Sequence, residues 1–598
     1  MSNNLFHGTS GPPDARIAIV GESYGFSERM KQKPFVGKSG QELDAILAEC
    51  KISRADVFCT NVINEQPPSN DMWRFFHPTV EARKQNKPLI RGLYPCNNVI
   101  ASLDILRQQL QTVQPEIIIG LGNYTLWALT EASFNIDDKE KRKIPTGIGQ
   151  WRGSQLYTRD EHIPFMPTFH PAAIFRNWPY RYAIKNDLAR RIPKVFQENG
   201  NGWREPKYNI IIRPSVKQVM DYLICIIAYL KNPNIESIDL SVDLETRGGH
   251  IACCGIGFPS AGIRLIGPNF LYDAQYFAKW WAIAQAISIP FMCAENPEGY
   301  FTLDEEVLII GNLSYILTHP KIRLIGQNFL FDAQYFAKWW AITVNCAFDT
   351  MLMHHVCWPG TPMGLGYLSS LYCEHHMNWK AEGDIGEDKE WGTDVPEEQL
   401  WTYNCKDVIK TAEIKYVLVK LIKQLGLEEQ AATQMAQFDM LLDVQLRGSK
   451  IDTKVRAKTS FDLMGAIDER VVWLDYIIPE DVLPRKPKAK HWTGSPQQQA
   501  ELFYDILGIP TAGSRSVNDE NLERIGRIEP ILWPITSCLQ ELRSLRVFNN
   551  NFCKARLDFG DRLRCSYNPT AKTFRYKSSR NAFGTGTNLQ NIPEGTAE

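Results

Sequence analysis

Two acidic residues in the middle of the chain, Asp243 and Glu245, stand two positions apart in the stretch SVDLETRGG. The apolar run IESIDLSV leads into them and predicts a strand, on which residues i and i+2 face the same side. Burying two carboxylates together costs free energy unless cations neutralise them. Two converging carboxylates on a buried strand would therefore need cations nearby.

Two further spacings follow along the chain. Asn328 and Asp332 lie in GQNFLFD, where the asparagine is a predicted helix N-cap and the aspartate lies one turn on. Tyr403 and Asp407 lie four apart in YNCKD and thus on one helix face. A lone D-x-E carries little information, but D-x-E, N-x-x-x-D and Y-x-x-x-D in this order form a specific pattern.

This order resembles the 3′–5′ proofreading exonuclease of family A DNA polymerases, the DEDD type with a tyrosine. The resemblance implies that Tyr403 orients the attacking water and that four carboxylates hold two Mg²⁺ or Mn²⁺ ions, namely Asp243, Glu245, Asp332 and Asp407. Such ions lie about 3.5–4 Å apart and stabilise the attacking and leaving oxygens. The alternative for these residues is a set of surface acids without metal. We interpret CEHH at 373–376 as loop residues, since three ligands in four positions rarely face one point.

Short polar motifs follow the predicted strands near the N-terminus. They are GESYG (21–25) with PFVGKSG (34–40), TNVINEQPP (60–68) and FHPAAIFR (169–176). In an open α/β sheet, ligands bind at the carboxyl ends of the strands. Together and in this order the motifs resemble the uracil-DNA glycosylase superfamily, closest to its family 4 branch, over about residues 15–195.

That resemblance implies a role for each of five residues. Glu22 activates water or stabilises the oxocarbenium-like sugar, and Phe35 stacks on the flipped uracil. Asn61 reads the base edge through its amide, which donates and accepts together. His170 hydrogen-bonds the uracil oxygen that gains charge as the bond breaks, and Arg176 lies on the loop that fills the gap in the duplex.

Two departures from family 4 concern cysteines and the first loop. Family 4 enzymes hold an iron–sulfur cluster with four cysteines; here Cys96 lies near one expected position, Glu65 replaces another, and no cysteine pair precedes Arg16. We therefore expect no iron–sulfur cluster. GESYG stands where the family has GEAPG, so Tyr24 enters the pocket loop. The residues leave two alternatives open, an active glycosylase or a DNA-binding relic.

The C-terminal part carries polymerase-like stretches. LLDVQLRGSKID resembles the start of the family A polymerase region, SPQQQAELFYDILGIP and SVNDENLERI its thumb, and CSYNPTAKTFRYKSSRNAFGTGTNLQNIP the strand and loop that grip primer–template DNA. The resemblance implies DNA contacts by Arg575, Ser578, Ser579, Asn588 and Gln590. No palm motif resembling DYSQIE or HDE follows NLQNIP, so we expect this chain alone not to extend a primer.

The elements that must position these residues predict a multidomain α/β protein. The strand-like runs ARIAIVG, DVFCTNVI, PEIIIGLG and IPFMPTF alternate with helical patterns, which predicts a parallel sheet for a glycosylase-like domain over residues 1–200. A mixed-sheet, RNase H-like exonuclease domain is predicted over 207–425. A mainly helical region, thumb and start of palm, is predicted over 426–598, and QENGNGWREP (197–206) is a predicted linker.

One segment occurs twice. IRLIGPNFLYDAQYFAKWWAI (263–283, copy one) and IRLIGQNFLFDAQYFAKWWAI (322–342, copy two) agree at 19 of 21 positions. Copy two fits the family order, so we expect Asp332 to be catalytic and Asp273 not. Copy one falls where the strands in HIACCGIGFP and AISIPFMC should join by a short turn, as an insertion into a hairpin loop. We expect its strand to find no place beside the D-x-E strand.

The composition is ordinary for a globular protein, with 44% hydrophobic and 22% charged residues, and 66 basic residues face 67 acidic ones. DNA contacts must therefore come from local patches. KEKRK (139–143) and RKPKAK (485–490) are interpreted as solvated surface. The 14 cysteines contain no C-x-x-C pair, and no apolar run is long enough to span a bilayer, which predicts a cytoplasmic protein, in the host cell if phage-encoded, without membrane contact.

These patterns predict a phage-type DNA replication or repair protein that binds primer–template and a single-stranded 3′ end. The carboxylate set favours a 3′–5′ exonuclease coupled to a uracil-DNA glycosylase-like domain. The alternative is a non-catalytic DNA-binding or uracil-sensing subunit that works with a separate polymerase chain.

Overall fold

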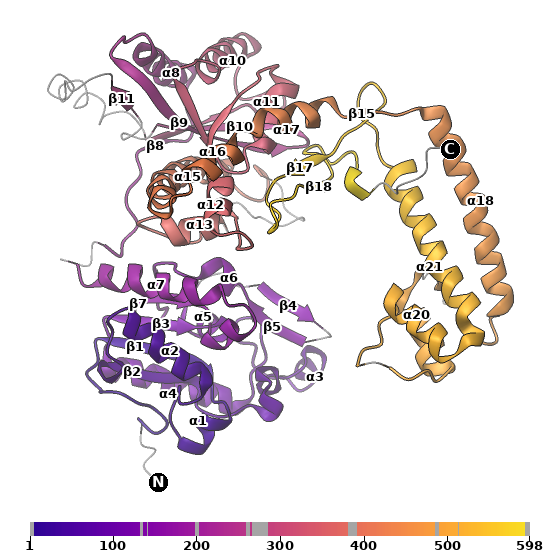
Figure 1. Ribbon diagram of the computed structural model, residues 1–598. Helices are drawn as coiled ribbons and strands as arrows, with labels where there is room; N and C mark the ends of the chain where they lie inside the picture. Colours follow the sequence, from indigo (N-terminus) through magenta and orange to yellow (C-terminus); the bar gives the residue numbers. More distant parts are fainter. Residues whose placement is uncertain are drawn as a thin grey trace. The chain divides into compact units, whose positions relative to one another are not determined.

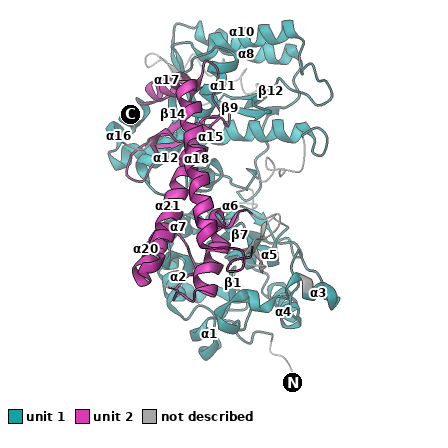
Figure 2. Cartoon of the chain, turned by 90° about the vertical axis from the view of Figure 1, so that its right-hand side faces the viewer, with its two compact units in different colours: residues 1–436 teal, residues 437–598 magenta. Residues whose placement is uncertain are grey.

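The computed structural model describes residues 5–131, 135–139, 142–197, 202–258, 263–265, 285–380, 391–484, 490–511 and 513–591 (Figure 1). These residues form two compact units, 1–436 and 437–598, called unit 1 and unit 2 below (Figure 2). Unit 1 contains both of the first two predicted domains. Residues 266–283 of copy one, with Asp273, and residues 485–489 of the second basic cluster lie outside the described residues.

The first sheet of unit 1 has the strand order β2-β1-β3-β7-β6. β1 is parallel to β2 and to β3, β3 is parallel to β7, and β6 joins the edge antiparallel. All four predicted strands are present and parallel, as expected. The bounds are β1 Ile17–Ser23, β2 Val57–Ile63, β3 Ile117–Leu121, β6 Leu156–Tyr157 and β7 Pro164–Thr168, with a separate hairpin of β4 Asn135–Lys139 and β5 Arg142–Thr146.

Helices cover both faces of this sheet because alternate side chains of each buried strand point to opposite faces. Ile19 of β1 belongs to a core cluster with α2 and α7, whereas Ala18 and Val20 belong to a second cluster with α4 and α5. The helices of this part are α1 Phe26–Lys31, α2 Lys38–Glu49, α3 Thr79–Lys84, α4 Asn97–Val113, α5 Asn123–Leu129, α6 Ile148–Trp151 and α7 Tyr180–Val195.

The second sheet of unit 1 is mixed, as predicted, with the order β14-β13-β9-β10-β12-β8 and with β11 paired to β9. The long strand β9 is antiparallel to β10 and parallel to β13. The bounds are β8 Ile210–Ile211, β9 Ile235–Arg247, β10 His250–Gly257, β11 Ile263–Leu265, β12 Ala286–Pro290, β13 Ile322–Gly326 and β14 Cys346–Asp349.

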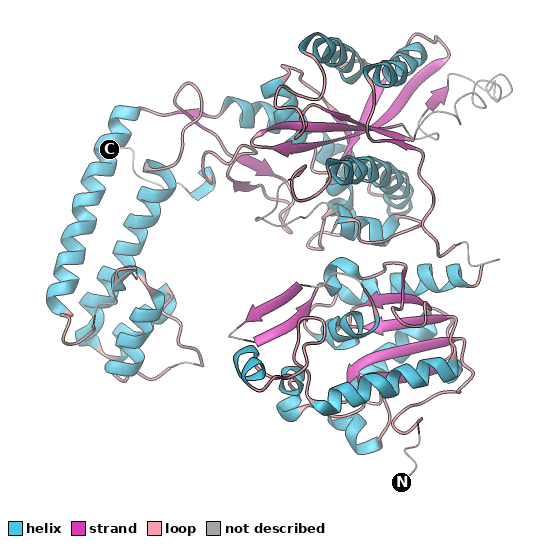
Figure 3. Ribbon diagram, turned by 180° about the vertical axis from the view of Figure 1, so that it is seen from behind, coloured by secondary structure: helices cyan, strands magenta, loops and turns pink. Residues whose placement is uncertain are grey.

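Figure 3 shows this sheet with α8 and α10 on one face and α15 on the other. α15 contacts β9, β10 and β12, so residues on its inner face lie against the strand with the D-x-E pair. The helix ends where Gly426 takes a left-handed φ of 66°, which glycine adopts without strain. The helices are α8 Val216–Leu230, α10 Leu303–Leu317, α11 Leu330–Trp339, α12 Thr350–Cys357, α13 Leu365–Tyr372, α15 Glu397–Leu425 and α16 Glu428–Met435.

The two copies of the repeat lie differently in this sheet. Copy two forms β13 and α11, followed by β14, in the order the pattern predicts. β10 and β12 are antiparallel neighbours, so copy one does interrupt a hairpin. The expectation that its strand has no place beside β9 is wrong, because β11 pairs antiparallel with residues 235–238 of β9. β11 and β13 both pair with Ile238 and therefore lie on opposite edges of β9.

Unit 2 is mainly helical, as predicted, with one long-range pair of short strands, β15 with β16, and one hairpin, β17 with β18. Its core contains Leu474 of α18, Leu522 of α20, and Leu539 and Leu542 of α21. The helices are α17 Phe438–Arg447, α18 Thr453–Ile477, α19 Pro496–Ala500, α20 Asp519–Ile528 and α21 Trp533–Phe548. The strands are β15 Ser449–Lys450, β16 Arg562–Leu563, β17 Ser566–Asn568 and β18 Lys577–Ser579.

No helix among the described residues combines the length and the apolar character needed to cross a membrane.

Candidate active sites

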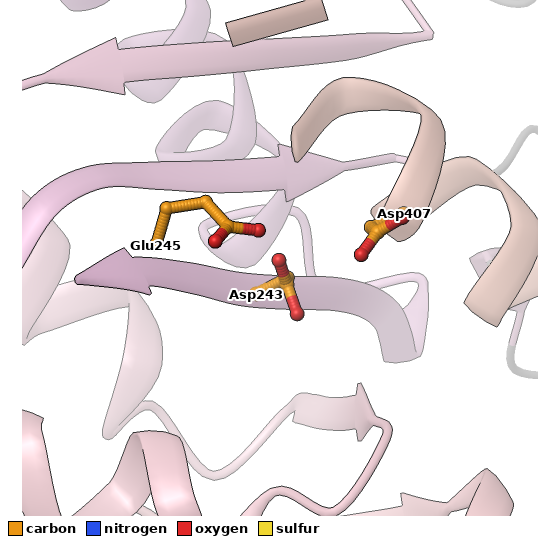
Figure 4. A group of neighbouring side chains, drawn as sticks. All are labelled: Asp243, Glu245 and Asp407. Carbon is orange, nitrogen blue, oxygen red and sulfur yellow. The ribbon is translucent and has the colours of Figure 1, made fainter. Parts of the chain in front are cut away.

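Three carboxylates of unit 1 converge from one strand and one helix. Asp243 and Glu245 leave the same side of β9, as their spacing requires, and Asp407 lies on α15 (Figure 4). Ligand oxygens of the three lie within 4.8 Å of one another. Over the described ranges, no other group of three or more acidic, histidine or cysteine residues has this spacing, and CEHH forms no such group.

The electrostatics of this group call for a cation. Burial, and then the charge of Asp407, raise the pKa of Asp243 to about 7. Burial, and then the charge of Asp243, raise the pKa of Glu245 well above its usual value. Mg²⁺ and Mn²⁺ prefer oxygen ligands and would balance these charges. The residues therefore fit divalent metal ions.

Asp332, the fourth predicted ligand, reaches the site in another way. It lies buried in the first turn of α11, and its Oδ1 accepts a hydrogen bond from the backbone N–H of Leu244 at 2.9 Å. Burial, and then the charge of Asp243, raise its pKa well above the usual value. Asp332 thus binds the backbone between the two β9 carboxylates and lies outside the group of three.

The prediction that Asn328 caps this helix is wrong. Phe329 is the N-cap residue, and Asn328 has a left-handed φ of 58°. The backbone N–H groups of both residues donate to the buried carboxylate of Asp349, at 3.1 and 2.8 Å. Asp349 also caps α12, so one carboxylate fixes the turn that places Asp332. Its signal in the sequence was an aspartate directly before a helix.

Lys380 contacts both Tyr403 and Asp407, which agrees with their predicted position on one helix face. The structure adds Trp379 and Lys380, which the sequence pattern missed. Trp379 Nε1 donates to Asp407 Oδ1 at 2.6 Å, and Lys380 forms an ion pair with the other oxygen of that carboxylate. Lys380 also donates to the Tyr403 hydroxyl at 2.5 Å. A single Trp-Lys pair has no periodicity that could have revealed it.

Asn404 is a second residue that was missed, although it lies beside the predicted tyrosine. Its fully buried amide donates to Asp243 Oδ2 at 3.0 Å and accepts from the Ser288 hydroxyl at 2.9 Å. Gly255 of β10 makes room for it, since a Cβ there would lie 2.6 Å from the amide oxygen. Asn404 therefore orients one of the candidate metal ligands.

The predicted base pocket gathers at the carboxyl ends of the first sheet. Glu22 is the next-to-last residue of β1, Asn61 lies on β2, and His170 follows β7 directly before the short helix η4 (Pro171–Phe175). These strands run parallel, so their carboxyl ends share one edge. Phe35 is buried in the loop between α1 and α2, with φ 56°.

Two glycines allow these side chains to approach. A Cβ on Gly21 would lie 2.7 Å from the ring of Phe35 and would also collide with the amide oxygen of Asn61. Gly122, with φ 102°, follows β3, and a Cβ there would collide with the carboxylate of Glu22. Only glycine fits both positions. The close packing brings the predicted stacking ring and the predicted base-reading amide together.

The two titratable residues of the pocket have shifted pKa values. Burial raises the pKa of Glu22 to about 7, although its carboxylate accepts the backbone N–H of Tyr124 at 3.1 Å. Burial lowers the pKa of His170 to about 4, so its imidazole is neutral at pH 7. His170 Nδ1 accepts the backbone N–H of Ala172 at 3.2 Å, which leaves the ring proton on Nε2.

Arg176 and Glu28 border this pocket. Arg176 is exposed at the end of η4, and its positive charge lowers the pKa values of both Glu22 and His170. Glu28, which the sequence pattern missed, is buried on α1 and accepts the backbone N–H of Gly37 at 2.9 Å. It thereby ties α1 to the second glycine-containing loop.

Tyr24 and the cysteine positions mark the departures from family 4. The Tyr24 ring is buried, and its hydroxyl donates to the Gly8 carbonyl at 2.6 Å, which fixes it against the N-terminal segment. Cys96 directly precedes α4, and Glu65 accepts from Asn98 at 3.1 Å. The absence of an iron–sulfur cluster stays a prediction.

The predicted DNA contacts of unit 2 lie two residues before β18, on β18, and in the segment up to Asn591. Arg575 and Ser579 are exposed, and Ser578 is half-buried. Gln590 donates through its amide to the Tyr576 carbonyl at 3.1 Å, and its backbone N–H donates to Asn588 at 3.0 Å. The hairpin and the following segment are thus joined.

Two family models match parts of unit 1. The family model for the uracil DNA glycosylase superfamily matches residues 9–191, and that for the 3′–5′ exonuclease matches residues 284–423. The type-4 uracil-DNA glycosylase of Saccharolobus solfataricus is 30% identical over 184 residues, which are 30% of this chain and 71% of that protein.

The DNA polymerase of Bacillus phage SP01 is 28% identical over 618 residues, which cover 91% of this chain and 59% of that polymerase. The chain therefore spans somewhat more than half of that relative. A solved structure of the POL domain of Pol1 from M. smegmatis in complex with DNA primer-template and dNTP aligns with a TM-score of 0.42 and 13% identity, over 65% of this chain and 56% of that chain. Through residues 9–191 the chain belongs to the uracil-DNA glycosylase superfamily, and that domain is followed by a 3′–5′ exonuclease domain.

Proposed function

We propose that the exonuclease domain removes nucleotides from the 3′ end of DNA with two Mg²⁺ or Mn²⁺ ions. The observation that carries this proposal is the convergence of Asp243, Glu245 and Asp407 within 4.8 Å, with Asp332 bonded to the backbone between the first two. The raised pKa values of these acids support the same conclusion, because the single ammonium of Lys380 does not balance three clustered carboxylates.

When bound, the two ions supply Lewis-acid stabilisation of charge on the phosphate and on the leaving oxygen. The residues of the chain have separate tasks in this proposal. The Tyr403 hydroxyl orients the attacking water by hydrogen bonding. Asn404 holds the carboxylate of Asp243, and Asp332 holds the Leu244 backbone, so that the β9 carboxylates stay in position.

For the glycosylase domain we propose excision of uracil that has been flipped out of the DNA stack. Phe35 stacks on the base, and the Asn61 amide reads its polar edge. His170, neutral with its proton on Nε2, donates to the uracil oxygen that gains charge as the glycosidic bond breaks. Glu22 in its ionised form stabilises the positive charge on the sugar or activates the water.

The partner of all three regions is DNA in this proposal. The residues on and after β18 hold primer–template, and the phage relative that covers most of the chain is a DNA polymerase. The protein then joins uracil removal and 3′-end trimming in DNA replication. A separate polymerase chain is a further partner in this proposal.

The test uses the full chain with labelled primer–template DNA, with and without uracil, in Mg²⁺ or in EDTA. We expect a ladder of shortened products that EDTA abolishes, and alkali-sensitive breaks only at uracil. Asp243→Ala with Glu245→Ala should remove the ladder and keep the breaks. A gel shift without either product would instead support a non-catalytic DNA-binding subunit.

A further inference from the structure

Lys380 is a charged side chain at the centre of the exonuclease site that the metal-binding pattern does not include. It forms an ion pair with the Asp407 carboxylate and donates to the Tyr403 hydroxyl at 2.5 Å. Its ammonium also lies 4.5 Å from the centre of the Tyr403 ring. One cation thus touches both residues of the Y-x-x-x-D motif.

The preceding residue completes this arrangement. Trp379 is buried, and its indole N–H donates to the second carboxylate oxygen of Asp407 at 2.6 Å. Both oxygens of Asp407 are therefore engaged by consecutive residues, Trp379 on Oδ1 and Lys380 on Oδ2. A divalent ion bound to Oδ2 would compete with the ammonium for the negative charge of that oxygen.

The segment that delivers Lys380 is anchored at several points and is no free surface loop. The carbonyl of His375 accepts the ammonium of Lys410, which lies three residues after Asp407 on α15, at 2.7 Å. His376 is buried, and its carbonyl accepts the backbone N–H of Gln155 from the glycosylase domain at 2.8 Å. The backbone before Lys380 is fixed, whereas its own side chain is long and flexible.

We propose that Lys380 is a positioning residue of the exonuclease reaction, which holds Tyr403 in place and yields Asp407 Oδ2 to the divalent ion. The proposal rests on the proposed exonuclease function of the same site. It assigns Lys380 two opposed effects. The ammonium competes with the metal for one oxygen, and it fixes the hydroxyl that orients water.

The two effects separate in the variant Lys380→Met, which keeps the stem and removes the charge. We expect it to bind Mn²⁺ at least about fivefold more tightly in the absence of DNA, because a positive charge next to the metal is gone. We expect its maximal single-turnover rate on single-stranded DNA at saturating Mn²⁺ to fall about tenfold or more, because the tyrosine loses its anchor. Binding is measured by titration calorimetry.

Lys380→Arg separates charge from geometry. It keeps a cation beside Asp407, so its Mn²⁺ affinity should stay near that of the wild type, while the planar guanidinium misplaces Tyr403 and lowers the maximal rate. Lys420→Met, an exposed lysine on the same helix as Asp407, is the matched control and should change neither quantity.

Weaker Mn²⁺ binding in Lys380→Met, or an unchanged maximal rate, would overturn the proposal. If Lys380→Met does not fold, Lys380→Gln takes its place with the same expectations. Loss of activity in Asp243→Ala with Glu245→Ala, combined with wild-type behaviour of the Lys380 variants, would reject only the role of Lys380. Failure of the wild type to bind Mn²⁺ would reject the exonuclease proposal itself.

Discussion

Arg191 of α7 should link the stability of unit 1 to exonuclease activity. Its guanidinium is fully buried and donates to the carbonyls of Ser370 at 3.0 Å, Cys373 at 3.2 Å and Glu374 at 2.7 Å. Burial lowers the pKa of Arg191 to about 10, so it stays charged at neutral pH. The acceptors lie in the segment that continues to Trp379 and Lys380. The substitution Arg191→Met keeps the unbranched stem and removes the donors.

The expected loss of stability in Arg191→Met follows from the hydrogen bonds of the guanidinium. The Cys373 carbonyl keeps Arg190 as a donor. Each acceptor left without a partner costs about 1–3 kcal/mol, so the carbonyls of Ser370 and Glu374 together cost about 2–6 kcal/mol. Loss of the buried guanidinium removes its own desolvation cost and offsets part of this. We expect the free energy of unfolding to fall by about 3 kcal/mol. Over the 436 residues of unit 1, at about 2.1 cal/mol/K of unfolding entropy per residue, this lowers the Tm by about 3 °C.

The assay combines calorimetry with single-turnover exonuclease rates at 25 °C. Because the same segment carries Lys380 to Asp407, Arg191→Met should also slow the exonuclease by about tenfold or more. Arg107→Met is the matched control, since Arg107 forms exposed ion pairs that contribute about 0–1 kcal/mol. Wild-type Tm and rate in Arg191→Met would refute this reasoning. A lower Tm with a wild-type rate would refute only the link to the exonuclease.

Three further outcomes are expected. Uracil excision should rise between about pH 6 and pH 8, because Glu22 acts in its ionised form and its pKa is raised to about 7. Glu22→Gln should abolish this rise, and a flat wild-type profile would contradict the role of Glu22. Gly21→Ala should lower excision about 100-fold or more, since the added Cβ meets the Phe35 ring, and should leave the exonuclease rate unchanged in the same preparation. Asp332→Ala should lower single-strand degradation about 100-fold, whereas Asp273→Ala should leave it nearly intact, and the reverse pattern would assign catalysis to copy one.

Much of the candidate chemistry is local and could be predicted from the sequence. The i, i+2 spacing places Asp243 and Glu245 on one side of a strand, and the i, i+4 spacing places Tyr403 and Asp407 on one helix face, wherever those elements pack. The apolar runs before the glycosylase loops likewise predict parallel strands whose ends meet. Short-range geometry is enough for all of these predictions.

Contacts between distant segments could not be predicted in this way. Trp379 and Lys380 meet Asp407 only because the segment after α13 folds over α15. Arg191 meets the Ser370 carbonyl only because α7 packs on α13. At Asn328 a distant residue overrides a local prediction. The N-terminus of α11 is bound by Asp349 from a neighbouring strand, and Asn328 does not cap it. No periodicity in the sequence records such pairings.

The repeat shows most clearly which features follow from the local sequence and which from contacts with distant segments. The residues Ile-Arg-Leu occur at 263–265 and 322–324, and both copies form strands beside β9, as their apolar and β-branched side chains favour. Yet β13 runs parallel to β9 at residues 238–241, and β11 runs antiparallel at residues 235–238 on the opposite edge. Identical residues determine that a strand forms, whereas its direction and partner depend on hydrogen bonds to a distant strand and on where the connecting chain leads.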